Sequence, residues 1–230
     1  MLTRVAIDGP SGSGKSTVSK MVARNFGFVY IDTGAMYRAC AYIYLNYKLD
    51  NDSFIEKINR SSFNFMKKGE KQLLVVKDND DELTLSDNIR TPEVTSVVSK
   101  ISAMSGIRSI LKIKQQKIAK SINCVMEGRD IGSIIIPDAE VKIFLVATVE
   151  VRAHRRYKEW KEKKIDTSYK KVLEDMERRD NYDMNRKIAP LKKTESMLLV
   201  DSTDSTIEEV VLTISEIINA KLKNNENICS

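Results

Sequence analysis

The stretch Gly9-Pro-Ser-Gly-Ser-Gly14-Lys15-Ser16 decides the fold, because it fits the pattern G-x-x-x-x-G-K-[ST]. It follows a short apolar run that starts at Val5 and precedes apolar residues at helical spacing, so it joins a predicted strand to a predicted helix. Glycines let backbone N–H groups converge on phosphate oxygens, because a Cβ atom would crowd that approach. Lys15 places a cation near the β- and γ-phosphates, and Ser16 offers a hydroxyl to Mg²⁺. We therefore predict an ATP site made of Gly9, Pro10, Ser11, Gly12, Ser13, Gly14, Lys15, Ser16 and Thr17.

A dinucleotide fingerprint is excluded at the same place, because G-x-G-x-x-G would require glycine at position 17, which is Thr17. The D-x-x-G and N-K-x-D motifs of GTPases are absent from the sequence, and so are the H-R-D and D-F-G motifs of protein kinases. These exclusions leave a small P-loop phosphotransferase.

The composition is that of a single globular domain with a small insertion. The chain has 230 residues, of which 42% are hydrophobic and 30% charged, with nine Gly and four Pro, so global disorder and fibrous repeats are excluded. Its apolar runs are far shorter than the roughly 20 residues of a membrane span, and the N-terminus lacks the features of a signal peptide. The cysteines Cys40, Cys124 and Cys229 have neither disulfide nor zinc spacing, so we expect a cytoplasmic protein.

The excess positive charge is confined to one segment. Residues 152–171 hold nine Lys or Arg against three Asp or Glu, a difference of +6, which equals the net charge of the whole chain. Such a segment suits a polyphosphate ligand, a solvated helix or a nucleic acid.

The pattern of strands and helices predicts an α/β fold. Expected strands lie at 5–7, 28–31, 124–126, 141–146 and 197–200, and expected helices lie at 35–44, 91–103, 109–120, 168–183 and 206–223. Strands that alternate with helices indicate a parallel sheet covered on both faces. Alternating apolar residues between 59 and 86 predict a small antiparallel meander inserted in this pattern.

A kinase that acts on a phosphorylated acceptor must hold two anions in line, so it needs several arginines besides the P-loop lysine. Four clusters supply them: 32–38, 127–130, 179–186, and the pair Ser99 and Arg108. The first two follow predicted strands, at the edge where open α/β sheets bind ligands. Arg179, Asp183 and Arg186 share one helical face if the helix continues that far.

The chain resembles the bacterial cytidylate kinases over nearly its whole length. The resemblance rests on the P-loop, on Asp32-Thr-Gly-Ala-Met-Tyr-Arg38, Asn88-Ile-Arg-Thr91, Glu127-Gly-Arg-Asp-Ile-Gly132, Pro137-Asp-Ala-Glu-Val-Lys-Ile-Phe-Leu145, Arg152-Ala-His-Arg-Arg156, 179–186 and Ala189-Pro-Leu191. It implies a nucleoside monophosphate kinase-like fold with a central parallel sheet flanked by helices, a small antiparallel β insert and a helical lid. One domain over 1–230 would then comprise a core (1–40, 87–150 and 168–230), an acceptor-binding and insert region (41–86) and a lid (151–167). The implied reaction is ATP with CMP or dCMP giving ADP with CDP or dCDP, with Mg²⁺, in a monomer that binds neither nucleic acid nor membrane.

The resemblance also implies roles for individual residues. Arg38, Arg129 and Arg186 would surround the acceptor phosphate, Arg179 and Asp183 would contact the sugar, and Ser99, Arg108 and Asp130 would read cytosine, with Thr33 and Tyr37 also lining the acceptor site. The cytosine amine suits a carboxylate acceptor, whereas uracil presents a carbonyl there. Ser16 and Glu127 would serve Mg²⁺, although Glu127 stands where many family members have Asp. Tyr182 stands where some members have arginine.

The basic segment occupies the position of the family's mobile lid. Lys15, Arg129 and either Arg155 or Arg156 are the expected catalytic residues, the last of which would neutralise charge on the transferred phosphoryl group. Three other functions remain open: a P-loop kinase for AMP, UMP or shikimate, a nucleic-acid-binding module, and an ATP-switched interaction protein.

Overall fold

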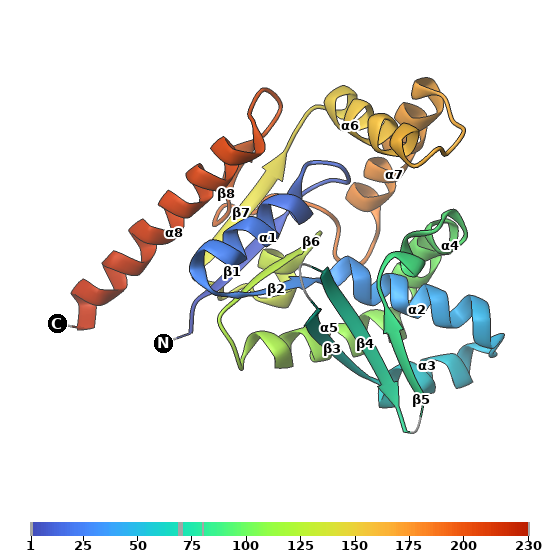
Figure 1. Ribbon diagram of the computed structural model, residues 1–230. Coiled ribbons are helices and arrows are strands. Elements are labelled where there is room, and N and C mark those ends of the chain that lie inside the picture. Colours follow the sequence, from blue (N-terminus) through green and yellow to red (C-terminus); the bar gives the residue numbers. More distant parts are fainter. Residues whose placement is uncertain (1, 69–70, 80, 230) are drawn as a thin grey trace. The chain divides into compact units, whose positions relative to one another are not determined.

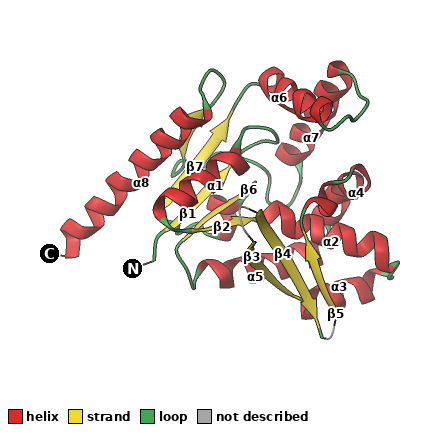
Figure 2. Cartoon of the chain, in the orientation of Figure 1, coloured by secondary structure: helices red, strands yellow, loops and turns green. Residues whose placement is uncertain are grey.

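The computed structural model describes residues 2–68, 71–79 and 81–229 of the chain (Figures 1 and 2). The chain divides into two compact units, Met1–Tyr30 with Ser121–Ser230, and Ile31–Lys120. Each unit has its own hydrophobic core. Among the described residues, no helix combines the length and apolar character needed to cross a membrane.

The first unit is built on a five-stranded sheet with the order β2-β6-β1-β7-β8. The β1–β6, β1–β7 and β7–β8 pairs are parallel. Strand β2 forms one edge and carries the chain from the first unit into the second. The strands are β1 (Arg4–Asp8), β2 (Val29–Asp32), β6 (Cys124–Gly128), β7 (Val141–Val146) and β8 (Leu198–Asp201). The predicted central parallel sheet is therefore confirmed.

The helices of the first unit are α1 (Lys15–Phe26), α6 (Val149–Glu162), α7 (Tyr169–Asn185) and α8 (Ile207–Cys229), with a short π-helix at Ile131–Ile135. Helices α1 and α8 pack against each other and against the sheet (Figure 1). The apolar residues of β1 are fully buried, which explains why that strand is apolar without alternation. Helices α6 and α7 pack as a pair around Ala153, Val172 and Met176.

The strand register brings three chain segments to one edge of the sheet. Asp8 lies opposite Gly128 of β6 and Phe144 of β7, so β1 and β6 end side by side and β7 ends nearby. The segments that follow these strands therefore emerge together, which is the usual ligand-binding edge of an open α/β sheet.

In its described residues, the second unit combines four α-helices with a three-stranded antiparallel sheet of order β3-β4-β5. Its helices are α2 (Thr33–Tyr47), α3 (Asn51–Arg60), α4 (Pro92–Ala103) and α5 (Ser105–Ala119), with a 3-10 turn at Asp87–Arg90. Its strands are β3 (Ser62–Lys68), β4 (Lys71–Asp78) and β5 (Asp81–Leu85). The predicted antiparallel insert is confirmed, and its apolar face packs on the helices around the buried Phe54, Ile58 and Leu111.

Helix α3 was not among the predicted elements. Its sequence carries the helical pattern nevertheless, because Phe54, Ile55 and Ile58 lie at helical spacing and form one apolar face. The N-cap is a second signal: the Asp50 carboxylate accepts hydrogen bonds from the backbone N–H groups of Asp52 and Ser53, both at 3.0 Å.

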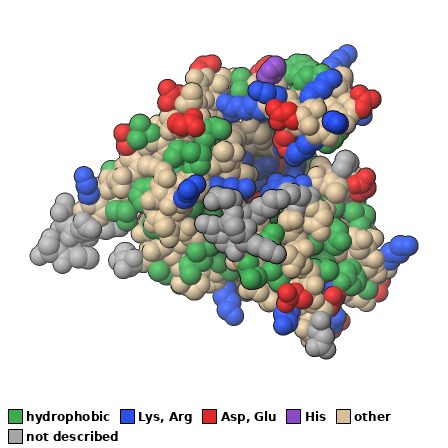
Figure 3. All heavy atoms as spheres, viewed as in Figure 1, with side chains coloured by type: hydrophobic (Ala, Val, Ile, Leu, Met, Phe, Trp, Pro, Cys, Tyr) green, Lys and Arg blue, Asp and Glu red, His purple; other side chains and the backbone are tan. Residues whose placement is uncertain are grey.

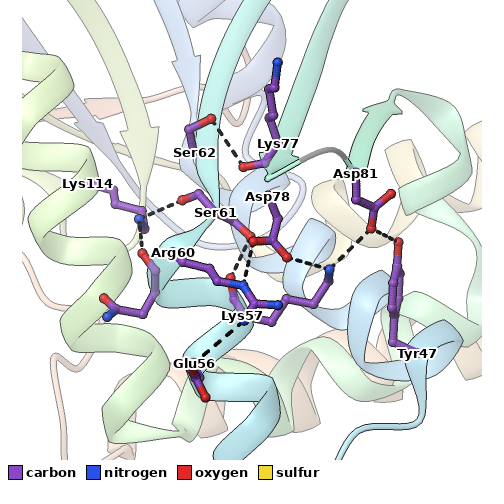
Figure 4. A network of polar contacts seen from close by, with 11 residues as sticks. Tyr47, Glu56, Lys57, Arg60, Ser61, Ser62, Lys77, Asp78, Asp81 and Lys114 are labelled. Carbon is purple, nitrogen blue, oxygen red and sulfur yellow. Dashed lines mark hydrogen bonds and ion pairs between the residues drawn. The ribbon is translucent and has the colours of Figure 1, made fainter.

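A partly buried ionic network, centred on the buried Lys57 and Asp78, joins α3 to the insert (Figure 4). The Lys57 ammonium donates to Asp78 at 2.8 Å and to Asp81 at 3.3 Å, and Arg60 Nε donates to the other oxygen of Asp78 at 2.6 Å. The Tyr47 hydroxyl donates to Asp81 at 2.5 Å, and the Lys57 ammonium lies 4.5 Å from the centroid of the Tyr47 ring. The two cations hold the pKa of Asp78 below its usual range although burial opposes the shift. The network therefore attaches the insert to α3, because each charged side chain in it has a partner of opposite charge.

Candidate active site

The loop between β1 and α1 forms a cradle of backbone amides. A Cβ atom on Gly9 would lie 2.0 Å from the carbonyl oxygen of Leu145, so only glycine fits between the loop and β7. Gly14 has φ +88° and is the N-cap of α1, where it offers no side chain to the first turn. The first N–H groups of α1 are therefore left for an anion, which is the arrangement of a phosphate site at a helix N-terminus.

The side chain of Lys15 folds back over this loop. Its ammonium donates to the Pro10 carbonyl at 2.6 Å and lies 3.4 Å from the Ser13 hydroxyl, and the residue is 5% exposed. Burial lowers the pKa of Lys15 to about 7, with a further contribution from the positive charge of Arg129. The ammonium therefore lies where an added negative charge would stabilise it strongly.

Three guanidinium groups of the first unit gather around the carboxylate of Asp183. Arg129 Nε donates to Asp183 at 2.9 Å, and Arg186 and Arg179 approach the same carboxylate at 3.7 and 4.0 Å. Arg186 also lies 3.8 Å from Asp130. Although burial opposes the shift, the surrounding cations hold the pKa of Asp183 below its usual range. The residues at 179, 183 and 186 do come together, as their helical spacing indicated, although α7 ends at Asn185.

This cluster holds more positive than negative charge. Burial lowers the pKa of Arg179, and repulsion from Arg129 lowers it further. Arg179 Nε is buried and has no hydrogen-bond partner among the described residues. Buried donors are normally paired, so this atom and the excess of guanidinium groups indicate a site for an anion.

Asp8 ties the P-loop strand to the segment that carries Arg129 and Asp130. Its carboxylate is fully buried and accepts hydrogen bonds from the backbone N–H groups of Ile131 and Gly132, both at 2.8 Å. Burial raises the pKa of Asp8 to about 6, although these two hydrogen bonds oppose the shift. The sequence analysis did not assign a role to Asp8, because a single acidic residue at a strand end gives no signal without knowledge of which strand lies beside it.

The first turn of helix α6 carries an arginine that binds the P-loop. Arg152 is 5% exposed, donates to the Ser11 carbonyl at 3.0 Å and the Ala147 carbonyl at 2.9 Å, and pairs with Asp180 of α7 at 2.7 Å. A Cβ atom on Gly12 would lie 3.2 Å from the Arg152 Cβ, so the loop packs directly on α6. Arg152 was not assigned as a site residue, and nothing in its spacing distinguishes it from Arg155 and Arg156, which follow it and are only half-buried.

The two expected lid arginines have different surroundings. Arg155 donates to the carbonyl of Ser202 at 2.6 Å, and Ser202 in turn donates to the Ser13 carbonyl at 3.2 Å. Arg156 lies 3.6 Å from Glu159, and its positive charge contributes to the lowered pKa of Arg179. Lys and Arg side chains gather over α6 and α7 in Figure 3. The predicted concentration of basic residues thus coincides with these two helices.

Glu127, at the end of β6, is a buried carboxylate beside the cradle. It is 4% exposed, accepts a hydrogen bond from the Tyr30 hydroxyl, and its charge acts on Lys15. No group of three or more His, Cys, Asp or Glu side chains that could hold a metal is found over 2–68, 71–79 and 81–229. One carboxylate beside a phosphate cradle fits Mg²⁺, which keeps most of its waters and binds the phosphates of its nucleotide.

The second unit carries the other expected acceptor residues. Arg108 is 8% exposed, donates to the Ser102 carbonyl at 3.1 Å, and lies 5.7 Å from the centroid of the Tyr37 ring. Arg38 donates to the Thr95 hydroxyl at 3.0 Å. Ser99, on α4, accepts a hydrogen bond at its carbonyl from Ser102 at 2.9 Å.

Asp32, at the end of β2, organises the start of α2 in the same unit. It accepts from the Ala35 N–H at 2.9 Å and from Arg90 at 2.8 Å, just before the buried Thr33. Arg90 and Thr95 had no assigned role in the sequence analysis, because each acts through a partner that is distant in the sequence, Asp32 for Arg90 and Arg38 for Thr95.

Comparison with known proteins identifies relatives over the whole chain. The family model described as cytidylate kinase matches residues 5–220. A cytidylate kinase of Lactobacillus gasseri is 44% identical over 227 residues, which cover 97% of this chain and 96% of that protein. A cytidylate kinase of Lactococcus lactis subsp. cremoris is 46% identical over 215 residues, covering 93% of this chain and 96% of that protein.

Solved structures support the fold. A shikimate kinase from Bacteroides thetaiotaomicron superposes with a TM-score of 0.50 at 14% identity, covering 95% of this chain and 99% of that chain. At this identity the likeness concerns the arrangement of the sheet and helices alone.

Proposed function

The chain belongs to the cytidylate kinase family, and from this premise we propose that it transfers the γ-phosphoryl group of ATP to CMP or dCMP, giving ADP with CDP or dCDP. The observation that carries the proposal is the group of Arg129, Arg179 and Arg186 around Asp183, close enough to the P-loop for the charge of Arg129 to act on Lys15. Two anion sites side by side are what a kinase with a phosphorylated acceptor requires. We further propose that the enzyme acts as a monomer.

On the donor side, the backbone of residues 9–17 binds the phosphates of ATP. The Pro10 carbonyl and the Ser13 hydroxyl hold the Lys15 ammonium beside the loop. The negative charge of the triphosphate raises the pKa of Lys15 and keeps it protonated. Ser16, the second residue of α1, faces the same phosphates.

On the acceptor side, Arg38, Arg129 and Arg186 bind the phosphate of CMP, and Arg179 and Asp183 contact the sugar. Asp183 has a second task, because its carboxylate orients Arg129 through the 2.9 Å hydrogen bond.

Cytosine is read by Ser99, Arg108 and Asp130, beside Thr33 and Tyr37. The carboxylate of Asp130 accepts from the exocyclic amine, and Arg108 donates to an acceptor on the ring. The Tyr37 ring and the Ser102 carbonyl hold the Arg108 guanidinium in one orientation. Uracil is disfavoured because its carbonyl would face the Asp130 carboxylate.

The transfer is in-line and has no covalent enzyme intermediate. Positioning and electrostatic stabilisation account for most of phosphoryl-transfer catalysis, so Lys15 and Arg129 suffice on the protein side together with one lid arginine. Of the two lid candidates we favour Arg156, because its charge already acts on Arg179 whereas Arg155 is bonded to Ser202. The segment 151–167 is the proposed lid, 41–86 the acceptor-binding and insert region, and the remainder the core.

Mg²⁺ fits this site, with Ser16 and Glu127 as the residues that would hold it. When bound, the ion neutralises charge on the β- and γ-phosphate oxygens. The contribution of the chain is to fix Glu127 at the end of β6, beside the cradle.

A panel of acceptors tests the proposal directly. The purified enzyme is incubated with ATP and Mg²⁺ and with CMP, dCMP, UMP, AMP or shikimate, and ADP release is measured. We expect the highest kcat/KM with CMP or dCMP. Strongest activity with AMP would overturn the cytidine assignment. If the protein binds nucleic acid without nucleotide and shows no turnover, it is a nucleic-acid-binding module and not an enzyme.

Asp130→Ala tests the base-reading assignment. We expect the KM for CMP to rise and the preference for CMP over UMP to fall, each by about 5- to 150-fold, because one well-placed base contact is worth about 1–3 kcal/mol. Asp138→Ala is the matched control, since this carboxylate pairs with Arg4 at the opposite end of β1 and is 70% exposed. Unchanged KM and unchanged C-over-U preference in Asp130→Ala would show the assignment to be wrong.

A further inference from the structure

Tyr30, near the beginning of β2, and Glu127, near the end of the neighbouring strand β6, form a buried pair. Tyr30 lies in β2 and is 7% exposed, and Glu127 lies in β6 and is 4% exposed. The Tyr30 hydroxyl donates a hydrogen bond to Oε1 of Glu127. The Lys20 ammonium lies 5.6 Å from the centroid of the Tyr30 ring, so the ring is held between α1 and the sheet.

The place of Glu127 in the sheet connects this pair to the phosphate cradle. Glu127 lies opposite Ile7 of β1, one residue before the level of Asp8, after which the cradle begins. The charge of Glu127 also acts on the buried ammonium of Lys15. The carboxylate therefore belongs to the donor side of the site.

A glutamate at this place needs a partner to hold it. Its carboxylate is separated from the backbone by three rotatable bonds, so several orientations compete unless one oxygen is fixed. A phenol that donates to Oε1 fixes the carboxylate without neutralising its charge. Residues that orient metal-binding carboxylates in this way contribute strongly to metal affinity, because they set the direction of the ligand.

We propose that Tyr30 is a positioning residue: its hydroxyl holds the Glu127 carboxylate in the orientation in which it serves the Mg²⁺ that accompanies the donor nucleotide. This inference rests on the proposed function. It adds a residue that neither the P-loop pattern nor the arginine clusters include.

Tyr30→Phe tests the inference, because it keeps the buried ring and removes only the hydroxyl. The affinity of Mn²⁺ for the enzyme–ADP complex is measured by water-proton relaxation, which needs no turnover. We expect Mn²⁺ to bind about 10- to 100-fold more weakly, the usual effect of removing a residue that orients a metal ligand. Turnover of CMP should recover at high Mg²⁺ concentration, because the carboxylate is still present.

Two further variants separate positioning from packing. Glu127→Asp shortens the side chain by one methylene, so the carboxylate no longer reaches Tyr30, and adding Tyr30→Phe to it should have no further effect on Mn²⁺ affinity. Tyr47→Phe removes another tyrosine–carboxylate hydrogen bond, the 2.5 Å contact with Asp81 in the second unit, and should leave Mn²⁺ affinity unchanged.

The outcomes distinguish the inference from the proposed function. The positioning role is wrong if the Tyr30→Phe enzyme binds Mn²⁺ as tightly as the wild type. It is also wrong if Tyr30→Phe lowers the Mn²⁺ affinity of the Glu127→Asp enzyme as much as that of the wild type. Either result would count against the role even if the enzyme phosphorylates CMP. If the wild type fails to phosphorylate CMP but Tyr30→Phe weakens Mn²⁺ binding to the ADP complex, the positioning role stands and only the acceptor assignment falls.

Discussion

Asp183→Asn is the most informative perturbation of the arginine cluster, because it removes one charge and keeps the shape of the side chain. In the wild type, the Asp183 carboxylate is 8% exposed and lies within 4.0 Å of the guanidinium groups of Arg129, Arg179 and Arg186. Removal of one partner from a buried ion pair costs about 3–5 kcal/mol, since the other charge is left uncompensated. Here Asp130 still compensates Arg186 in part. We therefore expect a loss of about 3 kcal/mol.

The magnitude can be measured by thermal unfolding. For a chain of this size, each kcal/mol shifts Tm by about 2–4 °C, so Asp183→Asn should lower Tm by about 6–12 °C. Asp175→Asn is the matched control on the same helix. Its partner Arg178 has a side chain that is 77% exposed, and exposed pairs contribute about 0–1 kcal/mol.

The loss should depend on anions and on pH. Inorganic phosphate supplies the missing negative charge without needing the sugar contact of Asp183, so it should raise Tm more in Asp183→Asn than in the wild type. The pKa of Asp183 is lowered by folding, so its stabilisation is complete above the unfolded value, about 4, and is lost as the pH falls through the lower folded value. The Tm difference should therefore persist at pH 5–8 and shrink in strong acid. An Asp183→Asn protein that melts within about 1 °C of the wild type, with no larger effect of phosphate, would refute this account.

Three further predictions concern other charged residues. Lys15→Ala should reduce kcat by at least about 100-fold. The Tm of this variant should equal or exceed that of the wild type, because burial disfavours the Lys15 ammonium. A variant that is still active in ADP-release assays would contradict the catalytic role. Lys57→Met should lower the unfolding free energy in urea by about 3 kcal/mol, because Asp78 stays buried with Arg60 as its remaining partner, while kcat stays unchanged. Folding raises the pKa of Asp8 to about 6, so its ionisation opposes folding at neutral pH, and this cost of about 3 kcal/mol disappears as the pH falls toward 4. Acid should therefore destabilise Asp8→Asn more steeply between pH 6 and 4 than the wild type, and parallel stability curves would argue against it.

The sequence predicted the parts of the fold that depend on local pattern. The apolar runs ending at Asp8 and Val146, the glycine-rich loop and the antiparallel insert are all found where they were expected. The exception among the α-helices is α3, which was not predicted although Phe54, Ile55 and Ile58 lie at helical spacing behind the Asp50 cap.

The site was predicted less completely, because its geometry depends on contacts between distant segments. The spacing of Arg179, Asp183 and Arg186 indicated a shared face, and these side chains do lie together. The spacing did not indicate that Asp183 also anchors Arg129, 54 residues earlier in the sequence. The hydrogen bonds of Asp8 and the pairing of Tyr30 with Glu127 likewise depend on strand order, which local sequence does not specify.

The hydrogen bond from Arg152 to the Ser11 carbonyl limits how the basic helix can open. With its guanidinium buried and also paired with Asp180, this residue fastens the first turn of α6 to the loop that grips the nucleotide. Any hinge that lets α6 swing outward must lie beyond Arg152, or each opening must break a buried ionic contact. Residues 153–167 can therefore move without breaking that contact only about a pivot that follows Arg152. Because Arg155 also binds the carbonyl of Ser202, a charge-removing change at position 152 would weaken the attachment of the helix without abolishing it.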